Sequence, residues 1–200
     1  MCGFSGFINS KGKFNKLECE RIVQNMMDAI IHRGPDDQGY WCDEKKGVSF
    51  GHRRLSILDL SSRGHQPMFS HSARYVAVFN GEIYNHLSLR RSLESENFNI
   101  PWRGHSDTET LLACFDAWGV KRTIQKCTGM FAIALFDIRK NSLYLIRDRI
   151  GEKPLYYGIQ NGVLFFASEL KSIKTHPSFQ GNIDHNALSL QLKYSYIPAP

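Results

Sequence analysis

The amino-acid sequence predicts an α+β fold built from antiparallel sheets. Two observations lead to this class. Short segments rich in aromatic and β-branched residues recur along the chain with short turn signals between them, which favours antiparallel pairing. Other segments carry apolar residues at helical spacing, and these helices must cover a sheet face to bury their apolar sides. The layers are therefore expected to stack, with helices packed on sheets.

The N-terminal part of the chain is expected to form a short strand at residues 2–8 and then one amphipathic helix. Asn15 and Glu18 have the spacing of a capping box, and apolar residues recur at helical spacing over 17–31. A polar stretch with glycine and proline at 32–39 ends this helix. Further strands are expected at Tyr40, 48–52 and 75–80.

Two helices are expected in the middle of the chain. Asn85 is placed to cap the first, which continues to Glu96. Ser106 and Glu109 form a second capping-box pattern before a helix that reaches Trp118. The rest of the chain is expected to be mainly strands, at 129–137, 142–148, 155–160 and 163–168.

Composition limits the class of protein. With 200 residues, 42% hydrophobic and 12% aromatic, the chain has enough apolar surface for a large core, which excludes disordered and collagen-like chains. Its longest apolar run, Met130 to Phe136, is much shorter than the roughly 20 residues of a membrane-spanning helix. The first residues also lack the pattern of a secretory signal. We expect a cytoplasmic protein with no membrane partner.

The charge pattern and the cysteine and histidine spacing argue against a nucleic-acid-binding protein and a metal-binding protein. The net charge is +6, but basic residues occur singly or in pairs, so no nucleic-acid partner is expected. The five cysteines include no C-x-x-C pair, and the eight histidines form no tight cluster. The sequence therefore predicts reduced thiols and no metal site.

Cys2 is the candidate for nucleophilic chemistry. Removal of Met1, which we expect because cysteine is small, would leave a thiol and a free α-amine on one residue. Reference pKa values are near 8.5 for a cysteine thiol and 7.7 to 8.0 for an α-amine. The amine can thus take the thiol proton close to neutral pH. An early cysteine is more often incidental, and lipidation would need an apolar segment before it. Cys2 by itself leaves the question open.

Several motifs with a fixed order add to this candidate. Together they resemble the N-terminal glutaminase domain of glutamine-hydrolysing asparagine synthetases and close asparagine synthetase-like amidotransferases, which are class II glutamine amidotransferases of the N-terminal-nucleophile (Ntn) hydrolase superfamily. The resemblance implies a four-layer αββα sandwich with two antiparallel sheets. The motifs are MCGFSG at 1–6, HRGPD at 32–36, GHRRLSILD at 51–59, GHQPM at 64–68, NGEIYNH at 80–86, SDTE at 106–109, GMFAIALFD at 129–137, RDRIGEKPLYYG at 147–158 and FASELKSI at 166–173.

The resemblance also implies roles for individual residues. The nucleophile falls on Cys2, and the oxyanion hole on the Asn80 side-chain amide and the Gly81 backbone N–H. A neutral amide suits this role because it stabilises developing negative charge without titrating. From the residues alone, Asn80-Gly81 is instead typical of a two-residue hairpin turn, and both interpretations are kept.

Recognition of free glutamine requires groups for an α-carboxylate and an α-ammonium. The resemblance implies that Arg54 binds the carboxylate and Asp107 the ammonium. Taken alone, Arg54 would be a surface cation and Asp107 a charge favourable to a helix N-terminus. The remaining substrate-binding positions implied by the resemblance are Leu55, Ile57, Leu58, Asn80, Gly81 and Glu82.

Other motif residues are expected to be structural. The HRGPD segment at 32–36 resembles a loop near the nucleophile with a structural or gating role. Asp148 and Arg149 are expected to form a buried ion pair or a contact with a partner domain.

The implied reaction is hydrolysis of L-glutamine to glutamate and ammonia through a Cys2 γ-glutamyl thioester, with no cofactor in this domain. In the family, ammonia passes to a synthetase domain that uses ATP and Mg²⁺ to amidate aspartate to asparagine. The chain lacks the S-G-G-x-D-S type loop of that domain. We therefore expect a glutaminase domain at 1–190 and the start of a linker to the synthetase domain at 191–200.

Three questions stay open at this stage. The acceptor differs among asparagine synthetase-like amidotransferases, so a sugar acid or another carboxylate is an alternative to aspartate. A non-catalytic glutaminase-like binding module is a second alternative, and five retained residues argue against it: Cys2, Arg54, Asn80, Gly81 and Asp107. A homodimer is a further partner to consider.

Overall fold

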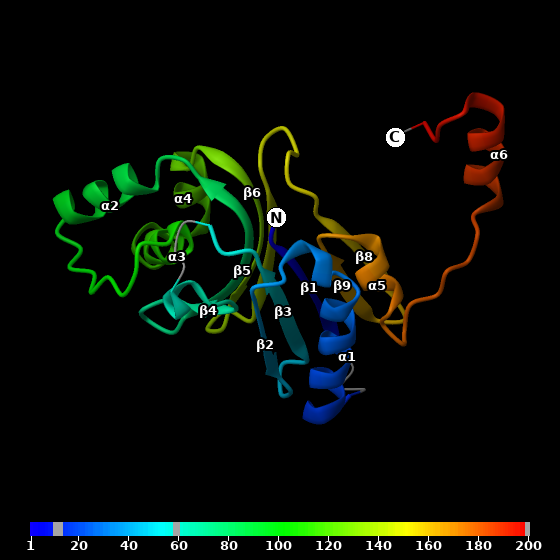
Figure 1. Cartoon of the computed structure of the whole chain (residues 1–200), viewed down its shortest axis with the longest axis horizontal. Coiled ribbons are helices and arrows are strands. Elements are labelled where there is room, and N and C mark those ends of the chain that lie inside the picture. The colour runs from blue at the N-terminus through cyan, green and yellow to red at the C-terminus, as the bar shows by residue number, and fades with distance from the viewer. Residues whose placement is uncertain (10–13, 58–60, 199–200) are drawn as a thin grey trace.

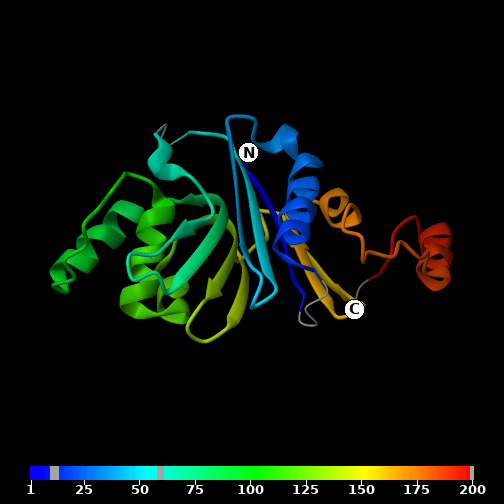
Figure 2. The same ribbon diagram turned by 90° about the horizontal axis from the view of Figure 1, so that it is seen from below.

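The computed structural model describes residues 1–9, 14–57 and 61–198. Two antiparallel sheets lie face to face between helices (Figures 1 and 2). The five-stranded sheet has the order β2-β3-β1-β9-β8, with β1 at Gly3–Asn9, β2 at Asp37–Asp43, β3 at Val48–Arg54, β8 at Tyr156–Gln160 and β9 at Val163–Ala167. The four-stranded sheet has the order β4-β5-β6-β7, with β4 at Met68–Phe69, β5 at Tyr75–Ile83, β6 at Gly129–Asp137 and β7 at Ser142–Arg147.

Helices cover the outer face of each sheet. The five-stranded sheet carries α1 at Lys16–Asp28 and α5 at Leu170–Lys174. The four-stranded sheet carries α2 at His86–Ser95, α3 at Asp107–Trp118 and α4 at Val120–Lys126. These four layers confirm the predicted αββα arrangement. The last helix, α6 at His185–Tyr194, lies apart from the layers and has no buried residue (Figure 1). None of the helices in the described ranges has the length and apolar character needed to cross a bilayer.

The alternation of side chains along each strand explains the layers. Successive residues of a strand point to opposite faces of its sheet. In β1, Phe4 packs between the two sheets and Phe7 packs beneath α1. In β5, Val76 and Val78 join the inter-sheet core, whereas Ala77 faces the helices of the other side. Strands β1 and β5 therefore carry apolar side chains on both faces.

The capping predictions are confirmed in part. Asn15 Oδ1 accepts the Glu18 N–H at 3.0 Å, and Glu18 Oε2 accepts the Asn15 N–H at 2.8 Å, so this box is complete. Helix α1 nevertheless ends at Asp28, before the predicted limit. Ser106 Oγ accepts the Glu109 N–H, but the Glu109 carboxylate binds the N–H groups of 103 and 104 instead of closing the box.

Two further expectations differ from the structure, and four elements were not predicted. Asn85 makes no side-chain cap to α2, because its amide bridges Lys126 O and Thr128 N. Strand β2 begins inside the stretch expected to be a loop. The four elements that the sequence did not predict are short or have weak hydrophobic periodicity: β4, α4, α5 and α6.

Candidate active site

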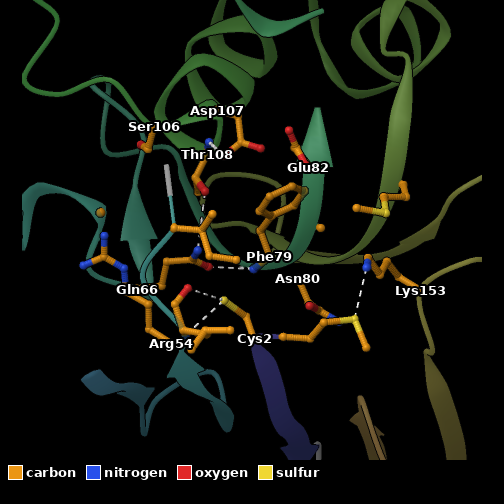
Figure 3. Close-up of a pocket in the computed structure, with 16 residues that line it drawn as sticks. Cys2, Arg54, Gln66, Phe79, Asn80, Glu82, Ser106, Asp107, Thr108 and Lys153 are labelled. Atoms are coloured by element: carbon orange, nitrogen blue, oxygen red, sulfur yellow. Dashed lines mark hydrogen bonds between the residues drawn. The ribbon is translucent and has the colours of Figure 1, made fainter. Parts of the chain in front are cut away.

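A cavity of about 140 Å³ lies where the start of β1 meets the ends of β3 and β5 and the N-terminus of α3 (Figure 3). Every predicted site residue in the described part of the chain lines it: Cys2, Arg54, Leu55, Ile57, Asn80, Gly81, Glu82 and Asp107. Leu58 lies outside the described residues. The structure thus brings together groups that are spread over half of the sequence.

The Cys2 thiol is held at the end of β1 beside the chain that leaves β3. The Leu55 N–H donates to Cys2 Sγ at 3.3 Å, and Sγ lies 3.5 Å from Leu55 O. The Arg33 Nε–H donates to Cys2 O at 2.9 Å, and Glu169 binds the same guanidinium at 3.0 Å. The main chain at Cys2 is therefore fixed by Arg33, which gives the HRGPD segment a structural contact to the candidate nucleophile.

Met1 stands between Cys2 and the solvent. It is 61% exposed, and its Sδ lies 3.2 Å from the Lys153 Nζ. While Met1 is attached, the Cys2 nitrogen is part of a peptide bond and cannot act as a base. Removal of Met1 would create the free amine at the edge of the cavity.

Asn80 and Gly81 lie within β5, so the hairpin-turn interpretation of this pair is wrong. Asn80 pairs with Ala132 and Gly81 with Phe131 in the β5–β6 ladder. Asn80 is 2% exposed, and its buried Nδ2 has no hydrogen-bond partner in the described part of the chain. An unpartnered buried donor is costly. A ligand oxygen in the cavity would supply the missing acceptor.

The direction of the Gly81 N–H follows from its neighbours in β5. The Phe79 N–H donates to Gln66 Oε1 at 2.7 Å, and the Ile83 N–H donates to Asp107 Oδ2 at 2.9 Å. Backbone N–H groups of a strand alternate between its two edges, so the Gly81 N–H points to the same edge as these two. Strand β4 covers this edge only at residues 76 and 77. The Gly81 N–H therefore points toward the cavity.

Gly81 is also required by the packing of the sheet. A Cβ at this position would lie 2.2 Å from Met130 O and 2.6 Å from Phe131 Cα. Any side chain would push β5 and β6 apart. The close backbone approach that glycine permits is thus to the neighbouring strand.

Arg54 and Asp107 supply opposite charges in the same cavity, and both are buried. Arg54 Nη1 donates to Ser61 O at 2.8 Å and lies 4.0 Å from Asp37, so the surface-cation interpretation is wrong. Burial raises the pKa of Asp107 to about 6, although the N–H groups of Ile83 and Thr108 donate to it and oppose this shift. A bound cation beside Asp107 would favour its ionised form.

Sequence reasoning missed part of the cavity. Met1, Gly64, Gln66, Phe79, Ser106, Thr108, Met130 and Lys153 also line it. Most of them lie in or beside the motifs, which is the only signal that could have found them. Within the described ranges, no group of three His, Cys, Asp or Glu side chains could hold a metal ion.

Lys153 is 7% exposed and reaches the cavity from the loop at 148–153. This loop is organised by Asp148, whose carboxylate accepts the N–H groups of Phe131, Glu152 and Lys153. Arg149 instead donates to the carbonyl oxygens of Cys127 and Gln125. The expected ion pair between Asp148 and Arg149 is therefore wrong.

Comparison with known proteins identifies the family. A family model described as a glutamine amidotransferase domain matches residues 1–200. Asparagine synthetase [glutamine-hydrolyzing] 1 of Bacillus subtilis is 38% identical over 200 residues, which are 100% of this chain and 30% of that protein. Asparagine synthetase [glutamine-hydrolyzing] 2 of the same organism is 42% identical over 177 residues, 88% of this chain and 23% of that protein. The chain thus spans less than a third of these two relatives.

One further relative and one solved structure are also similar to the chain. Amidase chry2 of Gibberella zeae is 36% identical over 179 residues, 86% of this chain and 26% of that protein. A solved structure of glutamine phosphoribosylpyrophosphate amidotransferase from B. subtilis has a TM-score of 0.71 at 18% identity, over 87% of this chain and 43% of that one. This last similarity shows the fold. The match along the whole chain establishes that it belongs to the glutamine amidotransferase domain family.

Proposed function

We propose that this domain hydrolyses the side-chain amide of L-glutamine to glutamate and ammonia. One observation carries the proposal. The Cys2 thiol, the N–H donors of Asn80 and Gly81, and the opposite charges of Arg54 and Asp107 all line one cavity. A nucleophile, an oxyanion hole and two charges that match an α-amino acid are the parts that such a reaction requires.

The proposed reaction begins after Met1 has been removed. The Cys2 thiol adds to the amide carbon while its proton passes to the α-amine of the same residue. Negative charge on the amide oxygen is stabilised by Asn80 Nδ2–H and the Gly81 N–H. The resulting ammonium gives its proton to the leaving nitrogen, so ammonia departs and a γ-glutamyl thioester remains. Water then attacks the thioester, releases glutamate and restores the thiol.

Substrate selection rests on the two charges. The planar guanidinium of Arg54 suits a carboxylate, and the ionised carboxylate of Asp107 suits an ammonium. Glu82, Leu55 and Ile57 complete the lining around these groups. A glutamine inside a protein has neither free charge, so this pair would select free glutamine.

The ammonia would serve a second domain outside this chain. The relatives named glutamine-hydrolyzing asparagine synthetases are more than three times longer, which supports a C-terminal partner that amidates aspartate with ATP and Mg²⁺. We place the glutaminase domain at 1–190 and a linker start at 191–200. Helix α6 spans this limit and lies apart from the layers, so the packed layers end before the helix begins. Cofactors are proposed for the partner domain alone.

Another acceptor is the alternative that a specific finding favours. Amidase chry2, which is named an amidase and not an asparagine synthetase, shares 36% identity with the chain. A sugar acid or another carboxylate therefore remains the second candidate, and only the acceptor domain would distinguish it from aspartate.

The test uses Cys2→Ala with Cys42→Ala as a matched control outside the cavity. Glutamate release should disappear in Cys2→Ala and persist in Cys42→Ala. Intact mass should show loss of Met1 and, after treatment with the glutamine analogue diazo-oxo-norleucine, one adduct that requires Cys2. Glutamate release by Cys2→Ala, or a fully retained Met1 in the active protein, would overturn the proposal.

A further inference from the structure

Strand β6 pairs with one edge of β5 at Phe79, and two side chains hold the N–H and the carbonyl of Phe79 on the opposite edge. The Phe79 N–H donates to Gln66 Oε1 at 2.7 Å, as Figure 3 shows. The Phe79 carbonyl, which belongs to the same peptide group as the Asn80 N–H, contacts His52 Nε2 at 3.1 Å. Phe79 directly precedes Asn80, so both contacts act where β5 enters the cavity.

The edge of β5 explains why such contacts matter. Strand β4 pairs with Val76 and Ala77 and ends there. Beyond Ala77 no strand covers this edge in the described part of the chain. Instead, Gln66 takes the Phe79 N–H and Asp107 takes the Ile83 N–H, which leaves the Gly81 N–H between them.

Both side chains are themselves fixed. Gln66 is 5% exposed, and its Nε2 donates to Thr108 Oγ1 at 3.4 Å, so its Oε1 faces Phe79. His52 is fully buried in β3, the strand that pairs with β1. Because a carbonyl oxygen only accepts, the proton between His52 and Phe79 is on Nε2. Burial lowers the pKa of His52 to about 4, so the ring is neutral at neutral pH.

We propose that Gln66 and His52 are positioning residues for the oxyanion donors Asn80 and Gly81. This inference rests on the proposed function. His52 joins the sheet that carries Cys2 to the sheet that carries Asn80, and Gln66 joins β5 to α3. The His52 contact therefore fixes the spacing between the two sheets beside Cys2, and the Gln66 contacts fix the donor strand β5 against α3. A misplacement of about 1 Å at such a site can cost on the order of 100-fold in rate.

The test compares reactions that do and do not form an oxyanion. Gln66→Met keeps the length of the side chain but removes the acceptor for Phe79 N–H. It should lower kcat for glutamine about 10-fold or more, with KM changed less than about 2-fold, because Arg54 and Asp107 still bind the substrate. Alkylation of Cys2 by iodoacetamide forms no oxyanion. Its rate should stay within about 2-fold of the wild type.

Five further variants complete the design. His52→Gln, which retains an N–H donor, should keep more kcat than His52→Met, which has none. Asn80→Ala should lower kcat by about 100-fold, and adding Gln66→Met to it should cause little further loss, because the two act on one element. Gln160→Met repeats the chemical change on β8, away from the cavity, and should leave kcat unchanged.

Several results would overturn the inference. One is a normal kcat in both Gln66→Met and His52→Met. Another is an equal loss of kcat and of the Cys2 alkylation rate in Gln66→Met. The third is a loss of kcat by Gln66→Met that is the same with and without Asn80→Ala. If Gln66→Met does not fold, the two His52 variants decide the question. Failure of the proposed function gives a different result. The wild-type full-length chain, with Met1 removed, would then release no glutamate from glutamine.

Discussion

Burial changes which interactions the charged side chains of Arg54 and Asp107 can make. Each has an ordinary role when taken alone, as a surface cation or as a charge at a helix N-terminus. In the structure both are buried beside one cavity, where water screens charges less. The binding of an α-amino acid proposed for these two residues would therefore be stronger than binding by the same residues at the surface.

Arg54→Ala should chiefly raise KM for glutamine, by about 10-fold or more, because a charged hydrogen-bonding partner of the carboxylate is lost. The KM of Arg54→Lys should fall between those of the wild type and Arg54→Ala, since lysine keeps the charge but lacks the planar guanidinium. Steady-state kinetics with glutamine measure both. A normal KM in Arg54→Ala would remove Arg54 from carboxylate recognition.

Asp107 should make glutamine binding depend on pH. Burial raises its pKa to about 6, so the fraction of neutral carboxyl grows as the pH falls through this value, and the attraction for an ammonium is lost. The dissociation constant of glutamine should therefore rise below about pH 6. Calorimetric titration of Cys2→Ala, which cannot turn over the substrate, measures this constant.

The control for this prediction is Asp107→Asn in the same Cys2→Ala background. It should bind glutamine weakly at every pH and lose the dependence near pH 6. A constant affinity of Cys2→Ala for glutamine from pH 5 to pH 8 would contradict the role of Asp107 in binding the ammonium.

At the scale of elements, Asp148 organises the loop that carries Lys153 to the cavity. Burial would raise the pKa of the Asp148 carboxyl, but donation from the backbone N–H groups of Lys153, Glu152, Phe131 and Gly151 holds it below its usual value. The carboxylate is therefore the form that the fold stabilises. This stabilisation is complete above the ordinary aspartate range and is lost as the pH falls through the lower folded value.

Asp148→Ala should lower the free energy of unfolding by about 2 kcal/mol or more, because buried N–H groups lose their acceptor. Asp148→Asn should cost less, since one oxygen can still accept. Urea denaturation at neutral pH measures both. An unchanged midpoint in Asp148→Ala would show that water replaces the carboxylate and that the loop does not depend on it.

At the scale of the whole molecule, the three apolar cores lie within the four layers, and α6 contributes no buried residue. Removal of residues 184–200 should therefore change the free energy of unfolding by less than about 0.5 kcal/mol. Removal from residue 170 onward is the matched comparison, because it also deletes the buried Ser172 and Ile173 of α5 and should destabilise the fold clearly. Thermal unfolding measures both truncations. A marked loss in the shorter deletion would show that α6 packs against the layers.

The sequence by itself determined the α+β class, most strands and the Asn15–Glu18 capping box. These features depend on alternation and on contacts between residues close in the chain, so local patterns are sufficient to predict them. The motifs also identified the candidate site residues. Asn85 shows the limit of local patterns, because its amide is taken by residues 126 and 128, far away in the sequence.

The tertiary structure alone decided how the site is assembled. It placed Asn80-Gly81 inside β5 rather than in a turn, and it added Gln66, His52 and Lys153 to the surroundings of Cys2. The physical reason is that the His52 and Lys153 contacts join segments that meet only after the sheets have stacked, and the Gln66 contact requires β4 to lie beside β5. Local preferences favour a turn for an Asn-Gly pair, and the pairing with β6 overrides this preference. The open edge of β5 then fixes which way the Gly81 N–H points.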